Sequence, residues 1–127
     1  MKVTVIGAGY VGLVTACCLS DSGNDVTCVE INQERVTQLN QGKLPIFEPG
    51  LDELFARNAR AKRLKFISDG RKALADSDVV FIAVGTPPSS DGSPNMKYVR
   101  EAADLVCQSV TRETVLVLKS TVPIGTA

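Results

Sequence analysis

The chain has 127 residues, the size of one domain, and a compact fold of this length can bury roughly two-thirds of the surface that the unfolded chain exposes. Hydrophobic residues make up 44% of it and charged residues 22%, which is typical of a globular protein and not of a disordered one. The 14 basic and 14 acidic residues cancel, which argues against the broad positive surface that nucleic acids and anionic membranes require. We therefore expect one domain over residues 1–127 that binds neither nucleic acid nor membrane.

The cysteines indicate a reducing compartment. There are four of them, with no CxxC pair and no histidine anywhere in the chain, so neither a disulfide framework nor a metal site is expected. Cys17 and Cys18 fall inside an expected helix and Cys28 inside an expected strand, where we interpret them as small buried apolar side chains. The longest apolar runs are far shorter than the ~20 residues that span a bilayer. These features predict a cytoplasmic location.

Five strands and five helices are expected to alternate along the chain. The strand-like runs are short and rich in Val and Ile without polar alternation, which suits parallel strands buried on both faces. The expected strands are Lys2–Ile6, Asp25–Val29, Leu64–Ile67, Val79–Val84 and Thr114–Leu118. The expected helices are Tyr10–Ser22, Asn32–Asn40, Leu51–Arg60, Gly70–Ala75 and Met96–Ser109. Gly23 and Gly42 are natural helix ends, because a left-handed residue is needed there.

This alternation predicts an α/β fold. The right-handed crossover rule makes a Rossmann-type parallel sheet the leading architecture, with strand order 3-2-1-4-5 and helices on its faces. Two long loops are expected, Lys43–Gly50, in which two prolines preclude regular structure, and Thr86–Pro94. A complete dinucleotide-binding fold commonly has six strands, whereas only five are found here. We therefore expect a sheet truncated before its sixth strand, in an N-terminal fragment of a longer enzyme.

The strongest motif is the glycine-rich segment GAGYVG at residues 7–12, between the first strand and the first helix. Gly7 permits a tight turn, Gly9 lets the backbone approach a pyrophosphate, and Gly12 lets the helix pack close to the strand. Tyr10 and Val11 open the helix, whose N-terminal N–H groups can bind phosphate. Glycine-rich turns also occur for steric reasons alone, but the surrounding strand, helix and acidic residue favour a dinucleotide site.

The acidic residue is Glu30, eighteen positions beyond Gly12 at the end of the second strand. Its carboxylate can accept hydrogen bonds from the adenosine ribose, which favours NAD over NADP. The alternative is a solvated charge at a strand end. Arg35 could receive a 2′-phosphate, but the carboxylate would repel that group, so we interpret Arg35 as flanking the adenosine or as a plain helix-surface charge.

Two later segments should reach the same edge of the sheet. Gly85, Thr86 and Pro87 follow the fourth strand at the point where the strand order reverses, and ligands of open α/β sheets bind in that crevice. Ser120 and Thr121 follow the fifth strand, where their hydroxyls could reach the nicotinamide half of the cofactor. The alternatives are a turn-rich loop for the first segment and helix N-capping for the second.

Taken together, these motifs resemble the N-terminal domain of the UDP-glucose 6-dehydrogenase family, within the wider UDP-glucose/GDP-mannose dehydrogenases. The resemblance covers the whole chain through GAGYVG (7–12), INQERV (31–36), EPGL (48–51), VGTP (84–87) and KSTVPIGT (119–126). The position of the proline in the last motif resembles the UDP-glucose branch more than the GDP-mannose branch.

The resemblance implies an enzyme that oxidises the C6 alcohol of UDP-glucose to the carboxylate of UDP-glucuronate, using two NAD and a thioester on a cysteine, in polysaccharide biosynthesis. It also implies a homo-oligomer. The positions matching Val11, Glu30, Arg35, Thr86 and Thr121 contact the cofactor in that family, and relatives more often carry aspartate at the position of Glu30. The family's nucleophilic cysteine lies beyond Ala127, so we expect no catalytic residue and no turnover in this chain alone.

Other functions stay open from the sequence. The chain could belong to a dehydrogenase for another nucleotide sugar, of the GDP-mannose or UDP-N-acetyl-mannosamine type, or be a non-catalytic NAD-binding module. A methyltransferase using S-adenosylmethionine is a weaker alternative, because it also pairs a glycine-rich loop with an acidic strand end.

Overall fold

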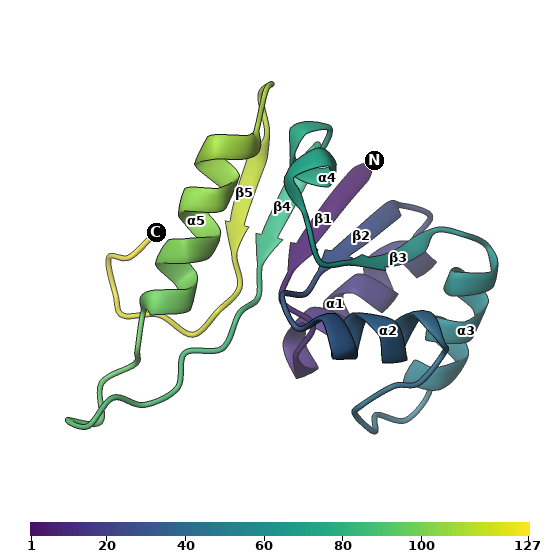
Figure 1. Ribbon diagram of the computed structural model, residues 1–127, viewed down its shortest axis with the longest axis horizontal. Helices are drawn as coiled ribbons and strands as arrows, with labels where there is room; N and C mark the ends of the chain where they lie inside the picture. Colours follow the sequence, from purple (N-terminus) through teal and green to yellow (C-terminus); the bar gives the residue numbers. More distant parts are fainter.

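A computed structural model describes all 127 residues as a parallel five-stranded sheet with helices on both faces (Figure 1). The strands are β1 (Lys2–Ile6), β2 (Asp25–Val29), β3 (Leu64–Ile67), β4 (Val79–Ile82) and β5 (Val115–Leu118). The helices are α1 (Tyr10–Asp21), α2 (Gln33–Asn40), α3 (Leu51–Arg60), α4 (Arg71–Ala75) and α5 (Lys97–Ser109). The strand order β3-β2-β1-β4-β5 confirms the predicted topology.

Side chains alternate between the two faces of the sheet and build two separate cores. Val3 and Val5 of β1 belong to the larger core, which α1, α2 and α3 cover. Ile6 belongs to the smaller core, formed with β4 under α4 and α5. Thr4 on this second face is also buried, and its hydroxyl pairs with that of Ser77 at 2.6 Å, so its polar atom is satisfied.

All ten predicted elements are confirmed to within two residues, and the small differences at their ends have simple causes. β4 ends at Ile82 and not at Val84, because its partner β1 ends at Ile6 and then turns away at Gly7. β5 begins at Val115, opposite Val79, the first residue of β4. The predicted helix ends at Gly23 and Gly42 are correct, since both residues have positive φ values of 93° and 83°.

The cysteine interpretation is correct for Cys17 and Cys28, which are both fully buried, and wrong for Cys18, which is exposed on the outer face of α1. Burial raises the pKa of the Cys17 thiol to about 12 and also raises that of Cys28. Both groups are therefore protonated at neutral pH. None of the five helices is long and apolar enough to cross a membrane.

Because all strand pairs are parallel, the carboxyl ends of the five strands meet along one edge of the sheet. The β1–α1 turn, the residues after β2 and β3, and the long loop after β4 all lie on this edge (Figure 1). The fold thus gathers the segments that the sequence singled out at the place where open parallel sheets bind ligands.

Candidate functional site

Three glycines shape the turn between β1 and α1. Gly7 has a φ of +104°, and a Cβ there would lie 2.6 Å from the carbonyl oxygen of Ala83. A Cβ on Gly12 would lie only 1.9 Å from the carbonyl oxygen of Gly7. A Cβ on Gly9 would have no heavy atom within 4 Å. The first and third glycines are therefore required by packing, whereas the second leaves the backbone open to an approaching ligand.

The N-terminus of α1 is not capped by a residue of the helix itself. Gly9 occupies the N-cap position without a side-chain cap, and the first turn of the helix holds no acidic residue. The first N–H groups of a helix have no partner within the helix, and the helix dipole places partial positive charge there. This end of α1 is therefore suited to an anionic group such as a pyrophosphate.

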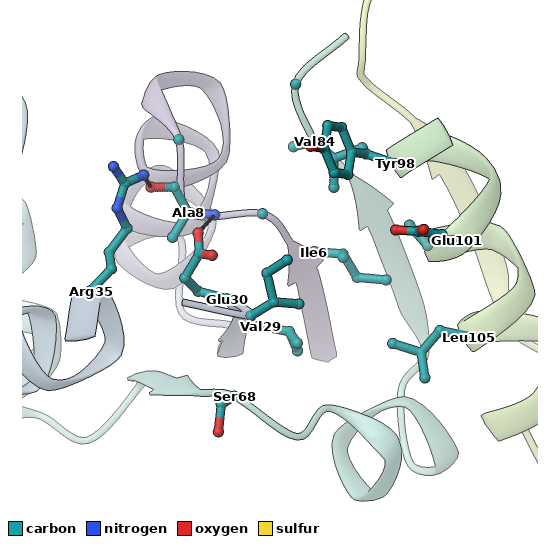
Figure 2. A pocket seen from close by; sticks show the side chains of 16 residues that line it. Ile6, Ala8, Val29, Glu30, Arg35, Ser68, Val84, Tyr98, Glu101 and Leu105 are labelled. Carbon is teal, nitrogen blue, oxygen red and sulfur yellow. Dashed lines mark hydrogen bonds between the residues drawn. The ribbon is translucent and has the colours of Figure 1, made fainter. Parts of the chain in front are cut away.

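The peptide groups of Ala8, in the middle of the glycine-rich loop, are held from two sides (Figure 2). A carboxylate oxygen of Glu30 accepts a hydrogen bond from the Ala8 N–H at 3.2 Å. The Arg35 guanidinium donates to the Ala8 carbonyl oxygen, also at 3.2 Å. Glu30 in addition accepts from the N–H of Asn32 at 2.9 Å, and the Asn32 side chain caps α2. The end of β2 and the start of α2 thus brace the loop.

A cavity of about 500 Å³ opens between this loop and α5 (Figure 2). Nine of its 16 lining residues are hydrophobic, so it offers an apolar interior with a few polar groups, as small-molecule sites usually do. Its lining comprises Ile6, Gly7, Ala8, Gly9, Val29, Glu30, Ile31, Arg35, Ser68, Ala83, Val84, Gly85, Tyr98, Glu101, Ala102 and Leu105. Five residues singled out from the sequence are among them, namely Gly7, Gly9, Glu30, Arg35 and Gly85.

The other residues singled out from the sequence lie outside this lining. Gly12 is buried against Gly7, and Val11 is 45% exposed at the start of α1. Tyr10 is 51% exposed, and its hydroxyl donates to the carboxylate of Glu48 in the loop before α3. This hydrogen bond raises the pKa of the Tyr10 phenol.

The residues after β4 and β5 form a linked pair of segments. The Ser120 hydroxyl donates to the carbonyl oxygen of Val84 at 2.7 Å, so it joins the ends of the two strands. No helix follows Ser120 or Thr121, which rules out the N-capping alternative. Thr121 and Pro87 are exposed, and Thr86 is partly buried. None of these side chains lines the cavity, although Thr86 and Pro87 directly follow its lining residue Gly85.

Sequence reasoning missed several cavity residues, which come from the glycine motif, the ends of β2 and β3, and α5. Ala8 lies inside the glycine motif, and Ile31 and Ser68 follow the ends of β2 and β3. Tyr98, Glu101, Ala102 and Leu105 belong to α5. Their spacing of three and four residues puts the last four on one helix face, a signal that was visible in the sequence.

No cysteine lies in the cavity. Cys17 and Cys28 are buried in the core, and Cys18 and Cys107 are exposed on helices without lining the site. A nucleophilic thiolate needs access to the substrate and a lowered pKa. The site therefore holds groups that bind and orient a ligand, without a candidate nucleophile.

Comparison with known proteins identifies what this arrangement resembles. The model of the UDP-glucose/GDP-mannose dehydrogenase family, NAD binding domain, matches residues 1–127. The UDP-glucose 6-dehydrogenase YwqF of Bacillus subtilis is 49% identical over 126 residues, which cover 99% of this chain and 29% of that protein. The UDP-glucose 6-dehydrogenase of Rhizobium meliloti is 51% identical over 127 residues, again 29% of its length. The chain thus spans less than a third of these relatives.

Solved structures of dehydrogenases are also similar to this chain. A ternary complex of GDP-mannose dehydrogenase from Pseudomonas aeruginosa superimposes with a TM-score of 0.93 at 37% identity, over 99% of this chain and 30% of that one. A UDP-glucose dehydrogenase from Pyrobaculum islandicum gives a TM-score of 0.91 at 41% identity, over 98% of this chain and 29% of that one.

Proposed function

Because this chain belongs to the UDP-glucose/GDP-mannose dehydrogenase family, as its NAD-binding domain, we propose that it is the cofactor-binding part of a UDP-glucose 6-dehydrogenase. The observation that carries the proposal is the braced glycine-rich loop, in which Glu30 and Arg35 hold Ala8 beside an open helix N-terminus. The substrate assignment is supported by the UDP-glucose 6-dehydrogenases of Bacillus subtilis and Rhizobium meliloti, at 49% and 51% identity.

In this proposal, different segments at the carboxyl edge of the sheet bind different parts of the cofactor. The N–H groups of Gly9, Tyr10 and Val11 bind the pyrophosphate at the start of α1, where the absence of a Cβ on Gly9 leaves room. The Glu30 carboxylate accepts from the adenosine ribose, and Arg35 flanks the adenosine. One carboxylate oxygen of Glu30 accepts a hydrogen bond from the Ala8 N–H and the other accepts from the Asn32 N–H. Because a carboxylate oxygen can accept more than one hydrogen bond, Glu30 can still bind the ribose.

The nicotinamide half is assigned to the segments after β4 and β5. Gly85 permits close backbone approach, and Thr86, Pro87 and Thr121 border the ring. Ser120 acts by holding these two segments together through its hydrogen bond to Val84. NAD, when bound, accepts a hydride from the C6 alcohol of the sugar. The chain's own contribution is to orient the ring and to shield one side of it from water.

The oxidation to a carboxylate needs a thiolate that this chain does not place in the site. We therefore expect the 127-residue chain to bind NAD without sustained turnover. The test is to mix the purified chain with NAD and UDP-glucose and to follow NADH absorbance, with NAD affinity measured in parallel. Sustained NADH production would contradict the proposal that this chain binds the cofactor without completing the oxidation. A folded chain that does not bind NAD would contradict the proposed cofactor site.

A second substrate class has its own support. The structures of a GDP-mannose dehydrogenase and of a UDP-D-ManNAc dehydrogenase both superimpose with a TM-score of 0.93, slightly above the UDP-glucose dehydrogenase value of 0.91. The cofactor site itself does not discriminate among these sugars. Turnover of UDP-glucose, GDP-mannose and UDP-N-acetyl-mannosamine by the whole enzyme, compared as kcat/KM, separates the candidates.

The cellular role follows from the same proposal. The enzyme would act in the cytoplasm as a homo-oligomer, and its product UDP-glucuronate would serve polysaccharide biosynthesis. Loss of the gene should then deplete UDP-glucuronate in cell extracts. An unchanged UDP-glucuronate pool in a strain with no second such enzyme would contradict the assignment.

A further inference from the structure

The EPGL motif at residues 48–51 has no role in the assignments above, although it is bonded to the start of α1. The Tyr10 hydroxyl donates a hydrogen bond to the Glu48 carboxylate, which lies 38 positions further along the chain. Tyr10 is the first residue of α1 and directly follows Gly9 at the N-cap. The bond therefore joins the loop before α3 to the helix end that is assigned to the pyrophosphate.

The main chain around Glu48 is fixed by its own contacts. Ile46 packs, partly buried, against the larger core, and Leu51 is 3% exposed within that core. The Leu51 N–H donates to the Glu48 carbonyl oxygen at 3.0 Å, across a turn in which Gly50 has a φ of 81°. Because the chain is anchored on both sides of Glu48, its carboxylate is a fixed acceptor for the Tyr10 hydroxyl.

The first turn of α1 has no comparable support from its own residues. Gly9 has no side chain to cap the helix, and glycine loses more conformational freedom on ordering than any other residue. The first N–H groups of a helix have no partner within it, and helix ends fray. The hydrogen bonds to Ala8 order the loop before Gly9, so the Tyr10 hydroxyl supplies the matching side-chain contact after it.

We propose, resting on the function proposed above, that Glu48 is a positioning residue for the cofactor. Through the Tyr10 hydroxyl it orders the first turn of α1, so that the N–H groups there are in place before the pyrophosphate arrives. Ordering these groups in advance reduces the entropy that binding must lose. The negative charge of Glu48 acts in the opposite direction, because it repels a pyrophosphate. The hydrogen bond and the charge can therefore be separated by substitution.

The test measures NAD affinity by calorimetry and Tm by thermal unfolding for each variant. Tyr10→Phe keeps the ring and removes the hydroxyl, and it should weaken NAD binding about fivefold, the size expected for one ordinary hydrogen bond. Glu48→Gln keeps an acceptor and removes the charge, so it should bind NAD at least as tightly as the wild type. Tyr10→Phe made in a Glu48→Ala chain should have little further effect, because the hydroxyl has already lost its partner.

Glu53→Ala is the matched control, since Glu53 is exposed in the first turn of α3 and makes no bond to Tyr10. It should leave NAD affinity unchanged. A Tyr10→Phe chain that binds NAD like the wild type, even with a lower Tm, would show that the pair only supports the fold, and would overturn the proposal. A Glu48→Gln chain that loses as much affinity as Tyr10→Phe would overturn it too. A folded wild-type chain that does not bind NAD would overturn the proposed function, and this proposal with it.

Discussion

The Glu30 carboxylate lies 3.2 Å from the backbone nitrogen of Ala8, so the residue assigned to the ribose also supports the loop assigned to the pyrophosphate. The two halves of the proposed adenosine diphosphate site would therefore be coupled through one side chain. Arg35 strengthens the coupling by donating to the carbonyl oxygen of Ala8. Changes at Glu30 should accordingly affect both cofactor affinity and cofactor choice.

We predict that the chain prefers NAD over NADP and that Glu30→Ala weakens NAD binding by roughly 10- to 150-fold, from the loss of charged hydrogen bonds worth about 1.5–3 kcal/mol. The same change should reduce the preference, because the charge that repels a 2′-phosphate is gone. Glu34→Ala, exposed in the first turn of α2, is the control and should change neither value. Equal affinity of the wild-type chain for NAD and NADP would contradict the assignment of Glu30 to the adenosine ribose.

Two glycines of the glycine-rich motif, Gly9 at the N-cap of α1 and Gly12 in its first turn, should respond differently to alanine. Gly12→Ala places a Cβ 1.9 Å from a backbone oxygen and should destabilise the fold by about 3 kcal/mol or more, seen as a lower Tm. Gly9→Ala meets no protein atom within 4 Å and has an ordinary φ of −76°, so the Tm should hardly change.

The Gly9→Ala variant should instead lose NAD affinity, because its methyl group occupies the space through which the pyrophosphate approaches the backbone. Calorimetry beside thermal unfolding separates the two effects. A Gly9→Ala chain that binds NAD like the wild type would show that the cofactor does not approach this backbone.

Acid should destabilise the chain through a cluster at the amino end of β1 and β4. Asp78 accepts from the Lys2 backbone N–H at 2.7 Å and from the Arg112 guanidinium at 2.8 Å, and these bonds hold its pKa below the usual value. The hydrogen bond from the Lys2 ammonium likewise lowers the pKa of Asp76. Because folding lowers both pKa values, the stabilisation is present above about pH 4 and is lost as the pH falls further.

The measurement is the Tm of the wild type and of Asp78→Asn between neutral pH and about pH 3. The variant should be less stable at neutral pH and should lose less on acidification. Parallel curves for the two proteins would mean that Asp78 does not contribute to the acid sensitivity.

The exposed edge of the sheet should promote self-association of this chain. β5 pairs only with β4, and Val115 and Leu116 are 59% and 45% exposed. A free edge strand with apolar side chains is a template for pairing with another copy. Light scattering should show association that grows with concentration and that Val115→Lys reduces. A strict monomer at high concentration argues against this.

The fold and the glycine-rich part of the site could be predicted from the sequence, because both depend on local sequence patterns. Valine-rich runs and turn glycines predicted the strands, their order and the loop that carries Gly7, Gly9 and Gly12. The β4 boundary was wrong because Ile82 is the last residue with a partner on both sides, which is a property of the assembled sheet. Local signals cannot reveal such pairing.

The α5 wall of the cavity was missed for a related reason. The sequence shows that Tyr98, Glu101 and Leu105 share a helix face, but not that this face overhangs the carboxyl edge of the sheet. That placement depends on how α5 packs through Ala102 and Val106 onto the second core. Ser120 was assigned to the cofactor because it follows the fifth strand at the carboxyl edge of the sheet. Its hydrogen bond to Val84 depends on how the ends of β4 and β5 lie in space, which the sequence does not show.

The central claim is that this chain alone carries the pyrophosphate and adenosine contacts of an NAD site, and its most direct test is a calorimetric titration of the folded 127-residue chain with NAD. We predict saturable binding at one site with low affinity, because a partly open cavity excludes less water than a closed one. Absence of any binding heat at about millimolar NAD, at two temperatures and with the chain shown to be folded, would contradict the account.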